Sequence, residues 1–399
     1  MIYLFVFCIS SLIIYLGETA KLKRLAPNNN RYSKNDALNL FWTKKVLIII
    51  ALFIPIFLAT FRHETVGIDV YTYMKPLYLC TKRSSDIADF FVQMKNDTAL
   101  QYMDYGYGFI AYVACKFFGT LNGLFFVNEL LCMLPVYFGI KNINSHLSRN
   151  KIDLNIPVWL GMFIWYCCFY NNSLNQVRQL IVCAILFYAF TLFLNKKYVI
   201  TVLLFCFSLT LHISAIIFIY IVLTYLICKS KHNFLRYLLA FLLIIFLIFS
   251  IDIFYFGMNI LKNLGLVPEK YQGEIFDVEY GERNINLSWL FIGLVMIFSS
   301  GFFYYKNRQN IFARFLFFVS LSFLSLFNIS SYFSSFGRIQ LYFMIYATVA
   351  IPSMSKVIKG NIIGNVSASS LLSILVVVAY WIVAVYLLDY TGTIPYKFM

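Results

Sequence analysis

Residues 175–194 read NQVRQLIVCAILFYAFTLFL, and no side chain from Leu180 to Leu194 is charged. An apolar run of this kind is typical of a helix that crosses a lipid bilayer, because a helix satisfies its own backbone hydrogen bonds there. Arg178 stands at the start of the run. A charge in hydrocarbon costs about 2.5 kcal/mol or more, so an arginine in this place is expected to have a partner or a function.

The composition extends this reading to the whole chain. Its 399 residues are 61% hydrophobic and 12% charged, with a mean hydropathy of +0.77, which leaves too little polar surface for a soluble fold. We therefore predict an all-α polytopic membrane protein, with residues 1–399 in a single transmembrane domain. The first apolar run follows no basic region and precedes no small-residue cleavage site, so it is expected to be a retained helix.

The apolar runs predict about 12 membrane crossings. Residues 198–228 are too many for one crossing, so they are expected to form two short helices that meet at His212. The predicted spans are 2–17, 45–61, 123–140, 154–170, 176–194, 198–212, 213–228, 234–254, 286–305, 311–327, 338–355 and 368–388.

The basic residues predict the orientation of these spans. Lysines and arginines gather in alternate loops, which the positive-inside rule places in the cytoplasm. The N-terminus and the C-terminus are then both outside, and the net charge of +15 needs no nucleic-acid partner. The basic loops hold Lys21, Lys23, Arg24, Arg31, Lys34, Lys44 and Lys45; Lys141, Arg149 and Lys151; Lys196 and Lys197; Lys229, Lys231 and Arg236; Lys306, Arg308 and Arg314; and Lys356 and Lys359.

Two longer segments, 62–119 and 255–285, form outer loops in this topology. Within the first, Tyr107 to Gly119 is too short to cross the bilayer and contains Lys116. It is expected to be a short re-entrant or interfacial helix.

The start of the first outer loop, RHETVGIDVYTY at 62–73, concentrates charged and aromatic residues. Gly67 permits a tight turn that would shelter Asp69, which makes Asp69 the candidate general base. Arg62 is a candidate anion ligand, and Glu64 and Tyr73 are candidate substrate ligands. The alternative is a solvent-exposed loop whose charged residues have no role other than hydration.

Asp104 and Glu129 are two further acidic residues that could either bind substrate or have a structural role. Asp104 precedes the short helix, where it would either cap the helix or accept hydrogen bonds from sugar hydroxyls, with Tyr107 as its aromatic neighbour. Glu129 lies inside the third predicted span and needs a partner, for which Arg62 and Arg178 are the candidates.

The remaining candidates are cations at predicted helix ends. Arg178 and Gln179 open a helix, and the planar guanidinium donors match the oxygens of a diphosphate. Arg338 repeats this arrangement near a later span, and His212 at a helix break could donate to phosphate or transfer a proton. The alternatives are arginines that snorkel to the membrane surface and a structural histidine.

The chain contains no pattern typical of a metal or cofactor site. Its nine cysteines lie mostly in apolar runs without a CxxC spacing, so buried thiols are expected. No cluster of aspartates resembles a metal-binding motif, and no cofactor is predicted.

Taken in order along the chain, the candidate motifs resemble those of the EpsG-type, or Wzy-like, bacterial polysaccharide polymerases. Family members often have Glu-Pro-Gly where this chain has Asp104-Tyr105-Gly106. The motifs are Arg62 through Tyr73, Asp104-Tyr-Gly-Tyr, Val177-Arg178-Gln179, Leu211-His212-Ile-Ser-Ala and Gly337-Arg338.

The resemblance implies a metal-independent membrane glycosyltransferase of GT-C-like architecture in the bacterial cytoplasmic (inner) membrane. Such an enzyme joins polyprenyl-diphosphate-linked oligosaccharide repeat units, donor and acceptor, into exopolysaccharide, capsule or O-antigen at the outer leaflet. Asp69 would be the base, and Arg62, Arg178, His212 and Arg338 would stabilise the departing diphosphate. The implied partners are the two lipid-linked oligosaccharides, membrane lipid and, as a candidate, a chain-length regulator protein.

Two other functional classes fit parts of the pattern. A flippase or transporter for lipid-linked oligosaccharide would also use arginines, but it should carry charges along the whole path and inverted repeats, which the sequence does not show. An O-antigen ligase or a membrane acyltransferase would share the fold class. The acyltransferase needs a histidine near the cytosolic side, whereas His212 is predicted to be outside.

Overall fold

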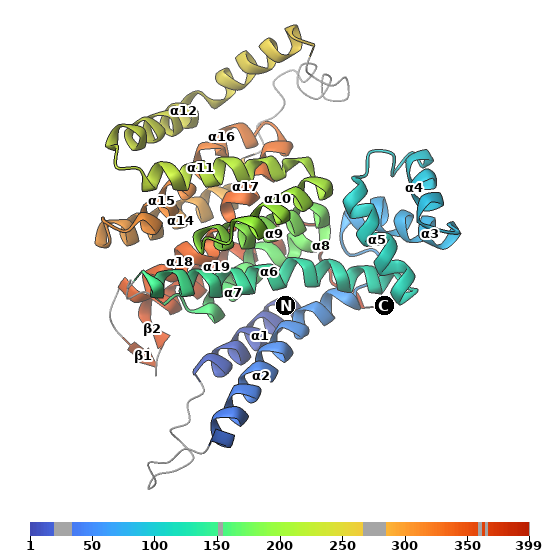
Figure 1. Ribbon diagram of the computed structural model, residues 1–399, viewed down its shortest axis with the longest axis horizontal. Coiled ribbons are helices and arrows are strands. Elements are labelled where there is room, and N and C mark those ends of the chain that lie inside the picture. The colour runs from blue at the N-terminus through green and yellow to red at the C-terminus, as the bar shows by residue number, and fades with distance from the viewer. Residues whose placement is uncertain (20–33, 151–154, 266–284, 358–360, 364–365, 399) are drawn as a thin grey trace. The chain divides into compact units, whose positions relative to one another are not determined.

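The computed structural model of the chain describes residues 1–19, 34–150, 155–265, 285–357, 361–363 and 366–398 (Figure 1). The chain divides into two compact units, one of residues 1–215 with 360–399 and the other of residues 216–359. The expectation of a single domain over 1–399 stays a prediction.

The first unit is a helical bundle with one short pair of strands. Its elements are α1 (Ile2–Thr19), α2 (Lys34–Thr60), η2 (Val70–Met74), α3 (Lys75–Arg83), α4 (Ile87–Asn96), α5 (Tyr105–Phe118), α6 (Leu121–Arg149), α7 (Val158–Trp165), η3 (Tyr166–Tyr170), α8 (Asn171–Asn175), α9 (Val177–Leu194), α10 (Tyr198–Leu211), β1 (Asn361–Ile363), β2 (Val366–Ser367), α19 (Ala368–Trp381) and η6 (Ile382–Leu387). The two strands pair antiparallel. The turn η4 (Ile213–Ile216) contains the boundary between the units.

Helix α9 forms the core of this unit. It is apolar on all sides, and such a helix is buried all round, as α9 is along most of its length. Helices α6 and α10 both pack against it, and α1 and α2 pack side by side as a hairpin (Figure 1). Helices α3, α4 and α5 contact one another and form a small cluster (Figure 1).

The second unit consists of helices. They are α11 (Ile217–Lys229), α12 (Asn233–Asn263), α14 (Leu287–Lys306), α15 (Ile311–Ser325), α16 (Phe327–Ser330), α17 (Ser334–Met344) and α18 (Ala347–Val357). Helix α14 packs against α15 and α18, while α11 and α12 both contact α15. Helix α12 is kinked at Phe249, whose φ of −109° and ψ of 21° are not helical.

The expectation of a polytopic helical membrane protein is confirmed, but the count of 12 crossings is not supported. Among the described residues, eight helices are long and apolar enough to span a bilayer. They are Ile2–Thr19, Phe41–Thr60, Leu121–Arg149, Val177–Leu194, Asn233–Ile260, Leu287–Lys306, Ile311–Ser330 and Ala368–Leu387. The other four predicted spans are helical too, but they are short, as in α10 and α11, or are interrupted, as in α7 with η3 and α17 with α18.

The two predicted outer loops contain more helix than expected. Residues 62–119 hold η2, α3 and α4 in addition to the predicted short helix, which is present as α5. Residues 255–263 continue α12, so the second predicted outer segment begins with helix, and its position outside the membrane stays a prediction. Apolar residues such as Phe256 and Ile260 extend the helix there because they continue its hydrophobic pattern. Residues 266–284 of that predicted loop lie outside the described residues.

Candidate functional site

The loop from Arg62 to Tyr73 is held against α8 by a glycine and an asparagine. Gly67 has a φ of 94°, and a Cβ there would lie 2.4 Å from the carbonyl oxygen of Leu174, so only glycine fits. The Asn175 Oδ1 atom accepts hydrogen bonds from the amides of Ile68 (2.9 Å) and Asp69 (3.2 Å). Asp69 is thereby fixed beside the start of α9, at the beginning of η2.

Arg178 and Asp104 form an ion pair at the start of α9. The Nη1 atom of Arg178 lies 2.9 Å from Oδ2 of Asp104, and the two side chains are 20% and 31% exposed. The Arg178 guanidinium also lies 5.2 Å from the centre of the Tyr73 ring. Asp104 stands at the N-cap of α5 but makes no side-chain capping bond, so its carboxylate serves Arg178 and not the helix end.

Tyr107, in α5, is affected by the charges of both Asp69 and Arg178. Its buried hydroxyl accepts a hydrogen bond from Asn128 Nδ2 at 3.1 Å. Burial raises the pKa of Tyr107 well above its usual range, the Arg178 charge opposes that shift, and the Asp69 carboxylate adds to it. The charges of Arg178 and Asp69 therefore both act on this hydroxyl.

A close contact at Gly106 brings the end of α10, where His212 lies, next to α5. A Cβ on Gly106 would lie 2.2 Å from Oγ1 and 2.6 Å from the carbonyl oxygen of Thr210, so α5 approaches the end of α10 closely. His212 caps that end. Its Nδ1 atom accepts a hydrogen bond from the backbone amide of Ser214 (3.2 Å), so in the neutral ring Nε2 carries the proton. The Ser214 hydroxyl lies 2.6 Å from the same Nδ1 atom.

Two other predicted site residues, Glu64 and Gln179, have different surroundings. Glu64 forms an ion pair with Lys75 at 2.8 Å, with both side chains about one-third exposed. The hydrogen bond to Glu64 raises the pKa of Lys75. Gln179, next to Arg178 in the chain, is buried in the bundle.

Arg62, at the start of the loop, and Glu129, in α6, are both buried, each with 2% of its surface exposed. The Arg62 guanidinium lies 4.3 Å from the centre of the Phe125 ring, and burial lowers its pKa while the Glu129 charge opposes that shift. Glu129 Oε2 accepts a hydrogen bond from Ser173 at 2.9 Å. Of the two candidate partners for Glu129, Arg62 is therefore the one whose charge acts on it, and Arg178 pairs with Asp104 instead.

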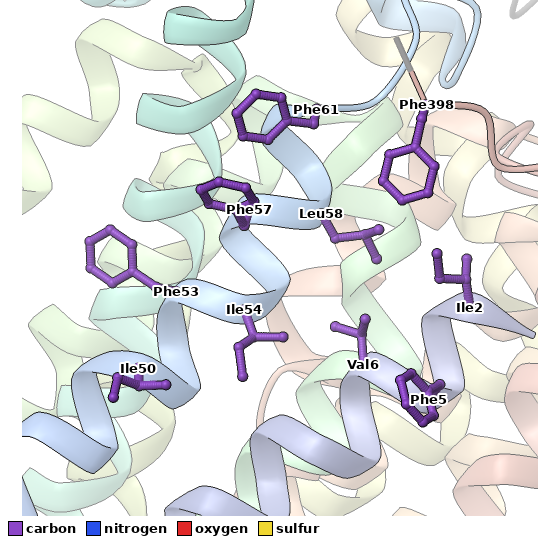
Figure 2. Close-up of a pocket in the computed structure, with 10 residues that line it drawn as sticks. All are labelled: Ile2, Phe5, Val6, Ile50, Phe53, Ile54, Phe57, Leu58, Phe61 and Phe398. Atoms are coloured by element: carbon purple, nitrogen blue, oxygen red, sulfur yellow. The ribbon is translucent and has the colours of Figure 1, made fainter.

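An apolar groove of about 710 Å³ runs between α1 and α2 beside this loop (Figure 2). Phe53, Phe57 and Phe61 line it from α2 and its end, Phe5 lines it from α1, and Phe398 lines it from the far end of the chain. All its lining side chains are apolar, so the groove suits hydrocarbon chains and offers nothing to a diphosphate.

Arg338 belongs to the second unit. It is exposed on α17, and its neighbour Gln340 is buried and donates a hydrogen bond to the carbonyl of Phe323 at 2.9 Å. Its predicted role in diphosphate binding stays a prediction.

The model of the EpsG family matches residues 45–398 of the chain. The chain belongs to the EpsG family. No curated protein and no solved structure matches it, so the GT-C-like architecture stays a prediction. The range matched by the EpsG family contains every predicted site residue, from Arg62 to Arg338. Family membership and the apolar helices together indicate a membrane protein of polysaccharide biosynthesis.

Side chains outside the predicted set hold the site in this EpsG-family chain. Asn175, Asn128 and Lys75 each contact a predicted site residue. Asn175 lies three residues before Arg178, so its place near the site could have been predicted from the sequence. No sequence pattern connects Asn128 with Tyr107. Among the described residues, no group of three His, Cys, Asp or Glu side chains is placed to hold a metal ion. The nine cysteines are free thiols, seven of them buried.

Proposed function

We propose that the protein is a metal-independent glycosyltransferase that polymerises polyprenyl-diphosphate-linked oligosaccharide repeat units at the outer leaflet of the bacterial cytoplasmic membrane. The observation that carries the proposal is the partly exposed Arg178–Asp104 pair, with Tyr73 against the guanidinium and with the Asp69 amide bonded to Asn175, three residues before Arg178. A cation, a carboxylate and an aromatic ring on one surface suit an anionic, sugar-bearing substrate. Membership of the EpsG family supports the reaction class.

In the proposed reaction, Asp69 accepts the proton of a sugar hydroxyl on the acceptor. The hydroxyl oxygen then forms a bond to the anomeric carbon of the donor, and the bond from that carbon to the diphosphate breaks. The electron pair of the broken bond stays on the diphosphate oxygen, where charge develops in the transition state.

Arg178 is the residue best placed to stabilise that charge. A guanidinium has five N–H donors, and the bond to Asp104 occupies one of them, so donors remain for phosphate oxygens. Asp104 holds the guanidinium in one orientation, which makes the fork geometry available before substrate binds. His212, with its proton on Nε2 when neutral, is a second donor candidate.

Arg62 and Glu129 take a supporting role in this proposal. With 2% exposure each, they lie behind the surface that a lipid-linked substrate could contact. The charge of Glu129 favours the charged form of Arg62, and removing Glu129 would leave the buried guanidinium without that charge. We therefore assign the diphosphate contact to Arg178 and not to Arg62.

The test is a reconstitution of the purified protein in liposomes with a polyprenyl-diphosphate-linked repeat unit. A ladder of longer oligosaccharides on a gel, unchanged by a chelator of divalent cations, is the expected result. Movement of the repeat unit across the bilayer with no new glycosidic bond would identify a flippase and refute the proposal. Transfer to an acceptor that carries no polyprenyl diphosphate would identify a ligase instead.

A further inference from the structure

The segment from Asp389 to Phe398 pairs with the loop that carries the candidate base. The amide of His63 donates to the carbonyl oxygen of Lys397 at 2.8 Å, and the amide of Gly67 donates to that of Gly392 at 3.2 Å. Arg62 and Phe398 form an antiparallel bridge. These backbone contacts run along the loop from Arg62 to Gly67, two residues before Asp69.

Thr393 is the centre of this segment and is 1% exposed. Its Oγ1 atom accepts a hydrogen bond from Asn171 Nδ2 at 2.8 Å and lies 2.7 Å from Oγ1 of Thr391. Its carbonyl oxygen accepts a bond from the Tyr3 hydroxyl at 3.0 Å, and its amide donates to Asp389 Oδ1 at 3.1 Å. One buried residue thus connects α1, α8 and the end of η6.

The hydrogen bond between Thr393 and Asn171 connects the segment to α8, which also contacts the loop. Asn171 begins α8 and also accepts a hydrogen bond from Trp381 Nε1 at 2.9 Å, so it is fixed from two sides. Asn175 ends the same short helix and binds the amides of Ile68 and Asp69. The loop is therefore hydrogen-bonded both to the 389–398 segment and to α8. Thr393 connects these two elements through its bond to Asn171.

We propose that the 389–398 segment positions the Arg62–Asp69 loop and that Thr393 is a positioning residue of the site. The inference rests on the proposed function only in taking Asp69 as the base. Thr393 itself touches no reacting atom. Its buried hydrogen bonds set the place of α8 and of the loop, and a displacement of about 1 Å in such a group costs on the order of 100-fold in rate.

The experiment compares Thr393→Val, Thr393→Ser and Thr348→Val in the full chain. Valine keeps the volume of Thr393 but leaves Asn171 and Thr391 without their partner, whereas serine keeps the hydroxyl. Thr348→Val is the matched control, because Thr348 is equally buried and its hydroxyl donates to the backbone carbonyl of Ile345, three residues earlier in the chain, at 2.7 Å. A nitroxide on Tyr71→Cys, two residues after Asp69 and 70% exposed in the native side chain, reports the mobility of the loop, with the exposed Cys8 and Cys206 replaced by serine.

The expected result is a more mobile nitroxide in Thr393→Val, with polymer output at least about tenfold lower. Thr393→Ser and Thr348→Val should match the parent protein in both measurements. If Thr393→Val is not recovered from the membrane, Tyr3→Phe replaces it, since it removes only the hydroxyl that donates to Thr393 and keeps the ring. Unchanged nitroxide mobility in these variants overturns the inference, whatever the output. Because mobility is measured without substrate, a failure of the proposed glycosyltransferase activity would leave this measurement intact.

Discussion

Asp69 and Glu64 lie five residues apart in the same loop, but Glu64 pairs with Lys75, whereas the Asp69 amide is bonded to Asn175, three residues before Arg178. We expect Asp69→Asn to lower polymer formation by about 10²–10⁴-fold, the usual cost of losing a general base, while single lipid-linked repeat units accumulate. Asparagine keeps the shape and the hydrogen-bonding capacity, so the loss would be one of proton transfer. Gel analysis of the lipid-linked oligosaccharides measures both species.

Glu64→Gln is the control for that experiment, because Glu64 is one-third exposed and pairs with Lys75. Screened pairs of this kind contribute little, so near-normal polymer is expected. Normal polymer from Asp69→Asn together with none from Glu64→Gln or Asp104→Asn would move the base assignment to that acid.

Arg178→Lys tests the guanidinium as distinct from its charge. Lysine keeps the positive charge near Asp104 but cannot offer two parallel donors to a diphosphate, so we expect strongly reduced polymer with a normal amount of protein in the membrane. Arg83→Lys, on the exposed end of α3, is the matched control and should have no effect. Equal polymer lengths from the two variants would rule out the diphosphate contact.

The contact between α5 and the end of α10 depends on the absence of a side chain at Gly106. Gly106→Ala should force the two elements apart, because the new methyl group would meet backbone atoms of Thr210 that cannot rotate away. We expect polymer formation to fall at least about tenfold, since the displaced segment carries Asp104. Polymer output per amount of membrane-inserted protein measures the effect.

Gly257→Ala in α12 is the control for this glycine, because no atom lies within 4 Å of a Cβ placed there. Alanine is favoured over glycine in a helix, so the control should insert and function normally. If Gly106→Ala also functions normally, the close approach of α5 and α10 has no role in the site.

Reporter fusions decide how many helices cross the membrane. The charge pattern predicts a cytoplasmic signal after Asn150, Lys196, Lys231, Arg308 or Lys359 and an outside signal after Lys95 or Glu279. If only the eight long helices crossed, with the N-terminus outside, the signals after Lys196, Lys231, Arg308 and Glu279 would all be reversed. We expect the first pattern, since α7, η3 and α8 follow one another from Val158 to Asn175. A cytoplasmic signal after Lys95 would contradict both topologies and the outward-facing site.

Much of the fold was predictable from the sequence because it depends on sums along the chain. Eight of the 12 predicted spans are long apolar helices, the other four contain shorter or interrupted helices, and the break at His212 occurs where two short apolar runs meet. The helices α3 and α4 were missed since their hydrophobic pattern is short and mixed with charges. The extension of α12 past residue 254 was missed because the loop was assigned by orientation and not by helical periodicity.

The candidate site was predictable only as a set of residue types. The membrane class, the helical spans and the residues that stand out as charges in apolar surroundings can be inferred from the chain alone, because each of these follows from transfer energies of neighbouring residues. Which of these residues meet depends on how the helices pack. Arg178 and Asp104 are 74 residues apart, and Asp69 and Asn175 are 106 apart, so their pairing arises from helix packing and from glycines that allow backbones to touch. The same packing buries Arg62 with Glu129, which no local pattern distinguishes from an exposed arginine.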